Sequence, residues 1–256
     1  MVIDTHTHLY LKEFAADIDD VINRAKNLKI NNFFLPAIDS SYTESMIALK
    51  NAYPDIMHLM AGLHPCSVKD NYLDELSHVK NVLKNHAIVA IGEIGIDLYW
   101  DKSTLNIQKK AFASQIRLAK DLNLPIVIHC RNAFDEIFEV LEKEKSENLR
   151  GIFHCFSGNY DQALKAISFN MKLGIGGVVT FKNGKIDKFL KKIPLDNLVL
   201  ETDSPYLAPP PFRGKRNESS YLSIIIDKLT EVYEIPAKKI IEITSTNAIE
   251  LFKIKV

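Results

Sequence analysis

The chain has 256 residues and a hydrophobic fraction of 46%, which suit one α/β-barrel domain that folds without disulfide bonds. Its 32 basic and 32 acidic residues cancel, which excludes a global field that would attract nucleic acid or a membrane. The three cysteines are odd in number and widely spaced, which argues against a disulfide framework. No apolar run is long enough to span a membrane and no signal peptide is recognisable, so we predict a cytoplasmic protein without a membrane partner.

Segments rich in apolar and β-branched residues alternate with segments of helical periodicity along the chain. The predicted strands are 2–9, 32–38, 56–63, 87–95, 125–130, 151–156, 171–178 and 197–203. The predicted helices lie near 16–29, 40–52, 71–84, 104–123, 133–145, 159–169, 185–192 and 219–234. A last amphipathic stretch, 236–252, predicts an additional C-terminal helix that begins at Pro236.

Eight strands that are each followed by a helix imply parallel strands with right-handed crossovers. We therefore predict the α/β class and a (β/α)₈ TIM barrel with an additional C-terminal helix; the alternative is an open doubly wound sheet. No linker, internal repeat or low-complexity segment interrupts the chain. Residues 1–256 are accordingly interpreted as one TIM-barrel domain of a metal-dependent hydrolase.

Two histidines stand two residues apart near the end of the first predicted strand. Because side chains alternate along a strand, His6 and His8 should point the same way and converge on one metal ion. The spacing alone is a weak signal, and two histidines in a strand by chance is the competing explanation.

Four further residues of metal-binding type lie at or near the ends of other predicted strands. Glu93 and Asp203 are carboxylates in apolar strands, where burial is costly unless a cation or a basic side chain neutralises them. Each of His129 and His154 ends an apolar strand and precedes a cysteine, which alternation should turn toward the helices. Glu201 shares the parity of Asp203 and is interpreted as a supporting or structural residue.

All six candidates fall on the end of the barrel where barrel enzymes keep their active sites. Four imidazoles and two carboxylates are too many ligands for one catalytic zinc ion, so they favour two divalent ions with a bridging ligand. The imidazoles favour Zn²⁺ or Mn²⁺ over Mg²⁺. The sequence does not determine which metal binds.

The loops at the same end are locally basic and aromatic. They contain Lys182, Lys185, Arg213, Lys215 and Arg216, with the aromatic residues Tyr99, Trp100, Tyr206 and Phe212 among them. Because a guanidinium matches a phosphate group, Arg131 and Arg213 are predicted to bind substrate phosphate. His64 is predicted to contact substrate, whereas His58, His78 and His86 are expected to be structural or surface residues.

Seven motifs in this order resemble the TatD family of metal-dependent deoxyribonucleases in the amidohydrolase superfamily. They are VIDTHTHL, GLHP, GEIGID, QKKAFASQIRLAKDLNLP, IVIHCRNA, FHCFSG, and ETDSPYLAP followed by RGKRNE. The resemblance covers nearly the whole chain. It departs from the family pattern at Tyr10, where Asp or Asn is usual, and at Ser219, where Pro is usual.

The resemblance implies a 3′-exonuclease on single-stranded DNA that uses divalent metal ions, Mg²⁺ being common in the family. It also implies that His6, His8 and Asp203 hold one ion, that His129 and His154 hold the other, and that Glu93 bridges them. The family also acts on RNA ends and aminoacyl esters, so the physiological substrate stays open. Tyr10 alters one wall of the pocket and with it the substrate preference.

The expected reaction is attack of a metal-activated water on the scissile phosphate, with Asp203 as proton acceptor and Glu93 in the catalytic set. One alternative is an amidohydrolase-type hydrolase of C–N or aminoacyl-ester bonds on the same dinuclear centre. Another is a metal-binding protein without catalysis, against which the intact ligand set argues. The sequence predicts no oligomeric state.

Overall fold

The computed structural model describes residues 1–255 and contains one sheet of eight parallel strands in chain order. The strands are β1 (Val2–Asp4), β2 (Ile30–Leu35), β3 (Met57–Ala61), β4 (Ile88–Asp97), β5 (Ile126–Arg131), β6 (Gly151–Phe153), β7 (Met171–Ile175) and β8 (Leu198–Leu200). Backbone hydrogen bonds from Thr5 N to Leu200 O and from Asp203 N to His6 O join the first and last strands. The predicted barrel is confirmed, because the sheet closes on itself.

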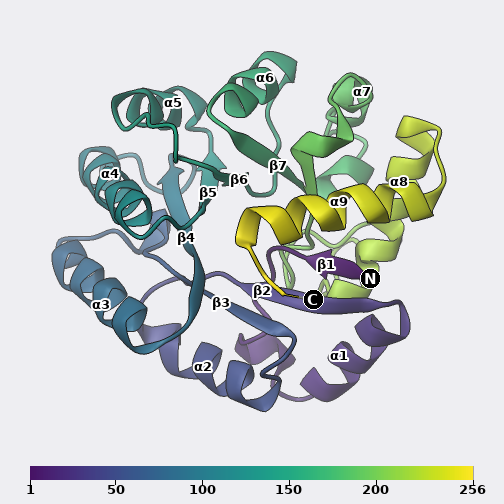
Figure 1. Ribbon diagram of the computed structural model, residues 1–256, viewed down its shortest axis with the longest axis horizontal. Helices are drawn as coiled ribbons and strands as arrows, with labels where there is room; N and C mark the ends of the chain where they lie inside the picture. Colours follow the sequence, from purple (N-terminus) through teal and green to yellow (C-terminus); the bar gives the residue numbers. More distant parts are fainter. Residues whose placement is uncertain (256) are drawn as a thin grey trace.

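Helices surround the barrel on the outside (Figure 1). They are α1 (Ile18–Asn27), α2 (Thr43–Ala52), α3 (Tyr72–Asn85), α4 (Leu105–Asp121), α5 (Phe134–Lys143), α6 (Tyr160–Ser168), α7 (Asp187–Leu190), α8 (Leu222–Tyr233) and α9 (Ala237–Phe252). Each lies inside the segment that helical periodicity predicts, apart from one-residue differences at the ends. The shortest, α7, keeps only four residues of its predicted segment.

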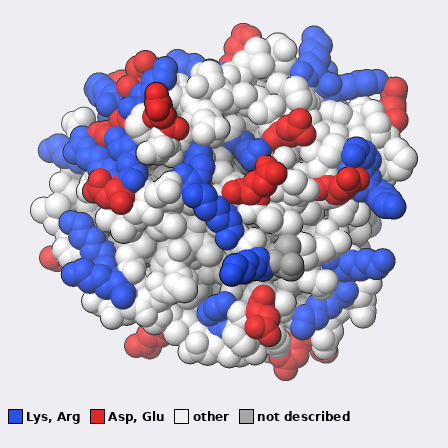
Figure 2. All heavy atoms as spheres, viewed as in Figure 1, with Lys and Arg blue, Asp and Glu red and all other residues white. Residues whose placement is uncertain are grey.

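The additional helix α9 closes the N-terminal end of the barrel. Leu251 and Phe252 pack into a cluster that lines the barrel interior, which contains Ile3, Phe34, Met60, Ala90, Val127, Ile152 and Val199. The rings of Phe34 and Phe252 lie 4.2 Å apart between centroids. In Figure 1 this helix crosses the end of the barrel nearest the viewer, and Figure 2 shows acidic and basic side chains intermingled on the same face. A catalytic site is therefore expected at the opposite end of the barrel, where the strands have their C-terminal ends.

A half-buried histidine, His58, lies beside the Phe34–Phe252 pair and makes stability depend on pH. His58 stacks on Phe34, and its Nε2 donates a hydrogen bond of 2.7 Å to the Asn32 side-chain oxygen. Burial, reinforced by Lys50, lowers the pKa of His58 from 6.5 to about 4. Because the unfolded chain takes up this proton near pH 6.5, stability is complete above that pH and decreases as the pH falls toward 4.

Between pH 7.5 and pH 5, we expect the free energy of unfolding to fall by about 1–2 kcal/mol less in His58→Gln than in the wild-type protein. Gln keeps a hydrogen-bond donor but does not titrate in this range. Urea unfolding at both pH values, with a chelator in every sample, measures the difference. An equal acid-induced loss in both proteins would contradict the assignment.

Candidate metal centre

The six predicted ligand residues come together at the C-terminal end of the barrel, although several lie beyond the strands. β1 ends at Asp4, β6 at Phe153 and β8 at Leu200, so the predicted strands 2–9, 151–156 and 197–203 are too long. His6, His8, His154 and Asp203 occupy the segments that follow these three strands. Asp203 has a left-handed backbone conformation with φ 57°. The histidine pair still converges as alternation predicts, with the rings of His6 and His8 5.2 Å apart between centroids.

Glu93 of β4 lies at the middle of the cluster and presents one carboxylate oxygen to each side. Its Oε2 is 3.2 Å from His6 Nε2 and 3.7 Å from His8 Nε2. Its Oε1 is 2.7 Å from both His129 Nδ1 and His154 Nε2. The two oxygens therefore contact different histidines, while the rings of His6 and His154 stack beside the carboxylate with centroids 4.0 Å apart.

The donor set fits cations. Three groups, each with ligand atoms within 4.8 Å of one another, overlap here: His6–His8–Asp203, His6–Glu93–His154 and His64–Glu93–His129. Within residues 1–255, both ring nitrogens of His6 are buried without a hydrogen-bond partner. His6 Nε2 faces two carboxylates, at 3.2 Å and 3.7 Å. A buried nitrogen aimed between two carboxylates is satisfied when a metal ion occupies the space between them.

The electrostatics of the cluster keep its central carboxylate ionised. Burial raises the pKa of Glu93, but His154 and His64 outweigh burial and hold that pKa well below its usual range. Burial lowers the pKa of His154, yet the attraction of Glu93 raises it well above 6.5 overall. Burial and then His154 lower the pKa of His6, which favours its neutral, ligating form. These charges are interdependent, as expected where an ionised carboxylate stands among imidazoles.

A tyrosine hydroxyl determines which nitrogen of His8 faces the centre. Tyr10 Oη lies 2.6 Å from the carbonyl oxygen of Pro36 and 2.8 Å from His8 Nδ1. A carbonyl only accepts, so the single hydroxyl proton goes to Pro36 and the tyrosine oxygen accepts from His8 Nδ1–H. His8 is thereby held with its Nε2 lone pair toward Asp203, 3.5 Å away. Tyr10, where the chain departs from the family pattern, therefore supports His8.

Two further carboxylates lie beside the remaining histidines. Asp97 Oδ2 lies 2.9 Å from His129 Nε2, which leaves Nδ1 to face the centre. Such a carboxylate–histidine pair fixes the ring orientation of a metal ligand. Glu201 Oε1 lies 3.6 Å from His154 Nδ1, beyond hydrogen-bond distance, and accepts from the backbone N–H of Cys155. Asp97 is not among the residues predicted for the site, although it lies in GEIGID, four residues after Glu93 on the same buried strand.

His64 lies deeper in the cluster than the sequence suggests. Its Nδ1 accepts from the backbone N–H of Cys66, so in the neutral ring Nε2 carries the proton. That Nε2 lies 3.2 Å from Glu93 Oε1 and 3.3 Å from His129 Nδ1. The arrangement makes His64 a hydrogen-bond donor that points into the site.

The two cysteines that follow the histidines differ. Cys130 packs against the main hydrophobic core, as alternation predicts. The prediction is wrong for Cys155, because β6 has already ended and Cys155 has a φ of 44°. Burial, together with the charges of Asp203 and Glu201, raises the pKa of the Cys155 thiol well above 9. The Cys155 backbone N–H donates to Glu201 Oε1, so Cys155 lies next to a carboxylate that flanks the centre.

The basic rim is smaller than the sequence suggests. The Arg131 guanidinium stacks 3.8 Å above the Tyr99 ring, and that of Arg213 stacks 3.9 Å above Phe181. Arg213 also donates to the Ala208 carbonyl at 3.0 Å. Arg216 is engaged elsewhere, because both of its terminal nitrogens lie 2.7 Å from the Asp17 carboxylate.

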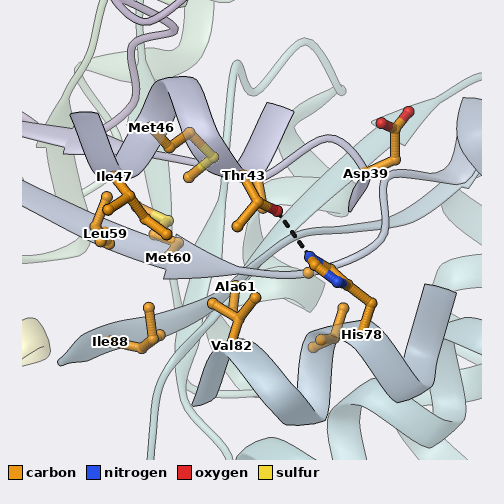
Figure 3. A pocket seen from close by; sticks show the side chains of 13 residues that line it. Asp39, Thr43, Met46, Ile47, Leu59, Met60, Ala61, His78, Val82 and Ile88 are labelled. Atoms are coloured by element: carbon orange, nitrogen blue, oxygen red, sulfur yellow. Dashed lines mark hydrogen bonds between the residues drawn. The ribbon is translucent and has the colours of Figure 1, made fainter. Parts of the chain in front are cut away.

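A separate small cavity lies behind the barrel wall and has no part in this centre. Figure 3 shows its lining from α2, β3 and α3, where Thr43 and His78 form a hydrogen bond of 2.8 Å. Its volume of about 20 Å³ suits a single water molecule and excludes a substrate. In residues 1–255, no helix has the length and apolar character that crossing a membrane requires.

Comparisons with known proteins identify the family to which the chain belongs. The family model described as TatD related DNase matches residues 3–253. YabD of Bacillus subtilis (strain 168), named an uncharacterized metal-dependent hydrolase, is 40% identical over 255 residues that cover 99% of this chain and 100% of that protein. A Pectobacterium parmentieri protein named 3′-5′ ssDNA/RNA exonuclease TatD is 30% identical over 99% of this chain and 100% of its own length.

A solved structure matches the fold along nearly the whole chain. The crystal structure of YjjV, a TatD homologue from Escherichia coli K12, superposes with a TM-score of 0.93 at 29% identity. The match covers 99% of this chain and 98% of that one. By sequence along nearly its whole length and by fold, the chain belongs to the TatD family of metal-dependent hydrolases.

Proposed function

We propose that residues 1–256 form one catalytic domain that hydrolyses phosphodiester bonds with two divalent metal ions, as a 3′-exonuclease on single-stranded DNA in the cytoplasm. The position of Glu93 carries this proposal, because its two oxygens face two separate groups of histidines. Two ions bridged by one carboxylate are the arrangement of many phosphoryl-hydrolysing sites. Zn²⁺, Mn²⁺ and Mg²⁺ are the candidate metals.

In this proposal His6, His8 and Asp203 would hold one ion and His129 and His154 would hold the other. Glu93, whose oxygens contact histidines of both groups, would be shared between them. The nitrogens that face the centre support this division, since His8 and His129 have their opposite nitrogens engaged by Tyr10 and Asp97. Bound divalent ions would lower the pKa of a water molecule and offset the charge of the phosphate.

The remaining chemistry falls to side chains. Asp203 accepts the proton of the attacking water; its pKa is lowered because His8 and His154 outweigh burial, so it is ionised at neutral pH. His64 donates from Nε2 to a phosphate oxygen. The guanidinium groups of Arg131 and Arg213, whose faces rest on aromatic rings, orient the phosphate through their N–H edges.

Nucleic acid as the substrate is supported by the family description and by the name of the Pectobacterium relative. The same centre would also suit hydrolysis of a C–N or aminoacyl-ester bond, as in other amidohydrolases. The two arginines at the mouth favour a phosphate-bearing substrate over this alternative.

A metal-reconstitution series tests the proposal. Chelator-stripped protein is loaded with Zn²⁺, Mn²⁺ or Mg²⁺ and assayed on single-stranded DNA, RNA and an aminoacyl ester. We expect release of mononucleotides from the 3′ end of DNA with at least one metal, at two ions per chain. Ester cleavage without phosphodiester cleavage would replace the proposed function by its alternative.

Tyr10→Phe should weaken metal binding about 10–100-fold, because losing a supporting hydrogen bond frees the His8 ring to turn. Competition with a chromophoric chelator measures the affinity, and the unfolding midpoint of the metal-free protein checks its integrity. Tyr42→Phe is a matched control, since its ring packs edge-on against Tyr10, with centroids 6.1 Å apart. Equal metal affinities of the Tyr10→Phe and wild-type proteins would show that the hydroxyl does not position His8.

Arg213→Ala should weaken binding of single-stranded DNA and reduce the slope of affinity against salt by about one phosphate contact. The expected loss is several-fold at 50 mM salt and smaller at 200 mM. Fluorescence anisotropy at several salt concentrations measures it. Arg150→Ala is the control, because Arg150 precedes β6 at the other end of the barrel. An unchanged slope would remove Arg213 from the substrate path.

A further inference from the structure

Exposed aromatic side chains stand on opposite sides of the metal centre. Tyr99 and Trp100, which follow β4, are 54% and 70% exposed, and Tyr206, which follows β8, is 50% exposed. In a closed barrel of eight strands, β4 and β8 are four positions apart in either direction. The two aromatic groups therefore lie on opposite sides of the mouth.

Each aromatic group is linked to a proposed metal ligand by hydrogen bonds or by a ring contact. Asp97 Oδ1 accepts from the backbone N–H groups of Tyr99, at 2.9 Å, and Trp100, at 3.1 Å, while its Oδ2 contacts His129. Tyr206 donates its backbone N–H to the Asp203 carbonyl at 2.8 Å, and its ring lies edge-on to His8. These contacts fix the positions of the aromatic residues relative to the proposed metal ligands.

Only some of the aromatic residues near the mouth present a free face. Arg131 covers Tyr99 at 3.8 Å, and its longer contact with Trp100, at 5.4 Å, and the edge-on contact of Tyr99 still leave Trp100 70% exposed. Phe212 stacks on Tyr221, with centroids 4.2 Å apart and an interplanar angle of 7°, so its inner face is occupied. Trp100 and Tyr206 are the two best placed to receive a planar ligand.

Given the phosphodiesterase function proposed above, we propose that the two nucleobases that flank the scissile phosphate stack on Trp100 and Tyr206. The phosphate then lies between them at the metal centre, beside the N–H edge of Arg131. Stacking accepts any base, because every base has a π-face, so cleavage shows little sequence preference. The shortest good substrate is a dinucleotide with both bases present.

Trp100 is the single tryptophan of the chain, so its fluorescence reports stacking directly. We expect a phosphorothioate-linked thymidine hexamer, which resists hydrolysis, to quench the emission of the metal-loaded protein. A hexamer of abasic sites with the same backbone charge should bind without quenching. Equal signals from the two oligomers would overturn the assignment of Trp100.

Kinetics on dinucleotides locate each base. Trp100→Ala and Tyr206→Ala should each raise KM about 5- to 20-fold on thymidylyl-thymidine. Each penalty should vanish on the substrate that lacks the base on that variant's own side. Trp100→Phe should keep the KM of the wild-type protein, and Leu122→Ala, an exposed residue at the far end of α4, should change nothing.

The outcomes separate the two proposals. If the wild-type protein cleaves no phosphodiester with any metal, the proposed function fails. If it cleaves but both alanine variants retain the wild-type KM on every substrate, the stacking sites alone are wrong.

Discussion

Glu93→Gln is expected to bind at most one metal ion per chain and to retain less than about 1% of hydrolase activity while remaining folded. Gln keeps the volume of the side chain but places an amide nitrogen, which does not bind metal ions, toward one of the two histidine groups. It also removes the negative charge that offsets two dications in a partly desolvated mouth. The rise in thermal midpoint on adding metal should shrink accordingly.

Elemental analysis, an activity assay and a thermal scan on the same folded sample measure this result. Glu144→Gln is a matched control, because Glu144 is also buried but pairs with Arg117 and Lys120 outside the barrel. That variant should keep both metal ions. Two tightly bound ions and near-normal turnover in Glu93→Gln would mean that the carboxylate is structural.

Gly95→Ala is expected to destabilise the protein by about 3–6 kcal/mol, or to prevent folding. Gly95 has a φ of 145°, which side-chain-bearing residues rarely adopt. A methyl group there would lie 2.0 Å from the carbonyl oxygen of His129, on the neighbouring strand. Relief would require β4 and β5 to separate between Glu93 and His129.

Urea unfolding of the metal-free protein measures the change. Gly214→Ala separates the two contributions, because Gly214 also has a positive φ, 80°, but an added methyl group would meet nothing within 4 Å. Its cost should be about 1 kcal/mol, from the backbone alone. Similar losses in the two variants would show that the contact with His129 is unimportant.

The strand ends show where sequence reasoning stops. Alternation and composition predict the eight strands, but they extend the first strand through Leu9 and the sixth through Phe156. Both segments keep apolar or β-branched residues after the hydrogen-bonded ladder has ended at Asp4 and Phe153. Where the ladder ends depends on the closure of the barrel, which no local pattern contains.

Contacts between residues far apart in the chain could not be predicted from the sequence either. Arg216 counts as part of a basic rim when read in sequence, yet in the fold it pairs with Asp17, 199 residues away. Asp97 and Tyr10 look like ordinary polar and aromatic residues until the barrel brings them to His129 and His8. The free energy of such contacts depends on geometry across strands and leaves no periodic signal.

By itself, the sequence determined the barrel and its additional C-terminal helix, because strand and helix periodicities are local properties of the chain. It also determined which residues of metal-binding type stand at the strand ends. The tertiary structure alone decided that Glu93 lies between two groups of histidines and which ring nitrogens face it. Those distances are set by the closure of eight strands, which brings residues 6, 93, 129, 154 and 203 to a common centre.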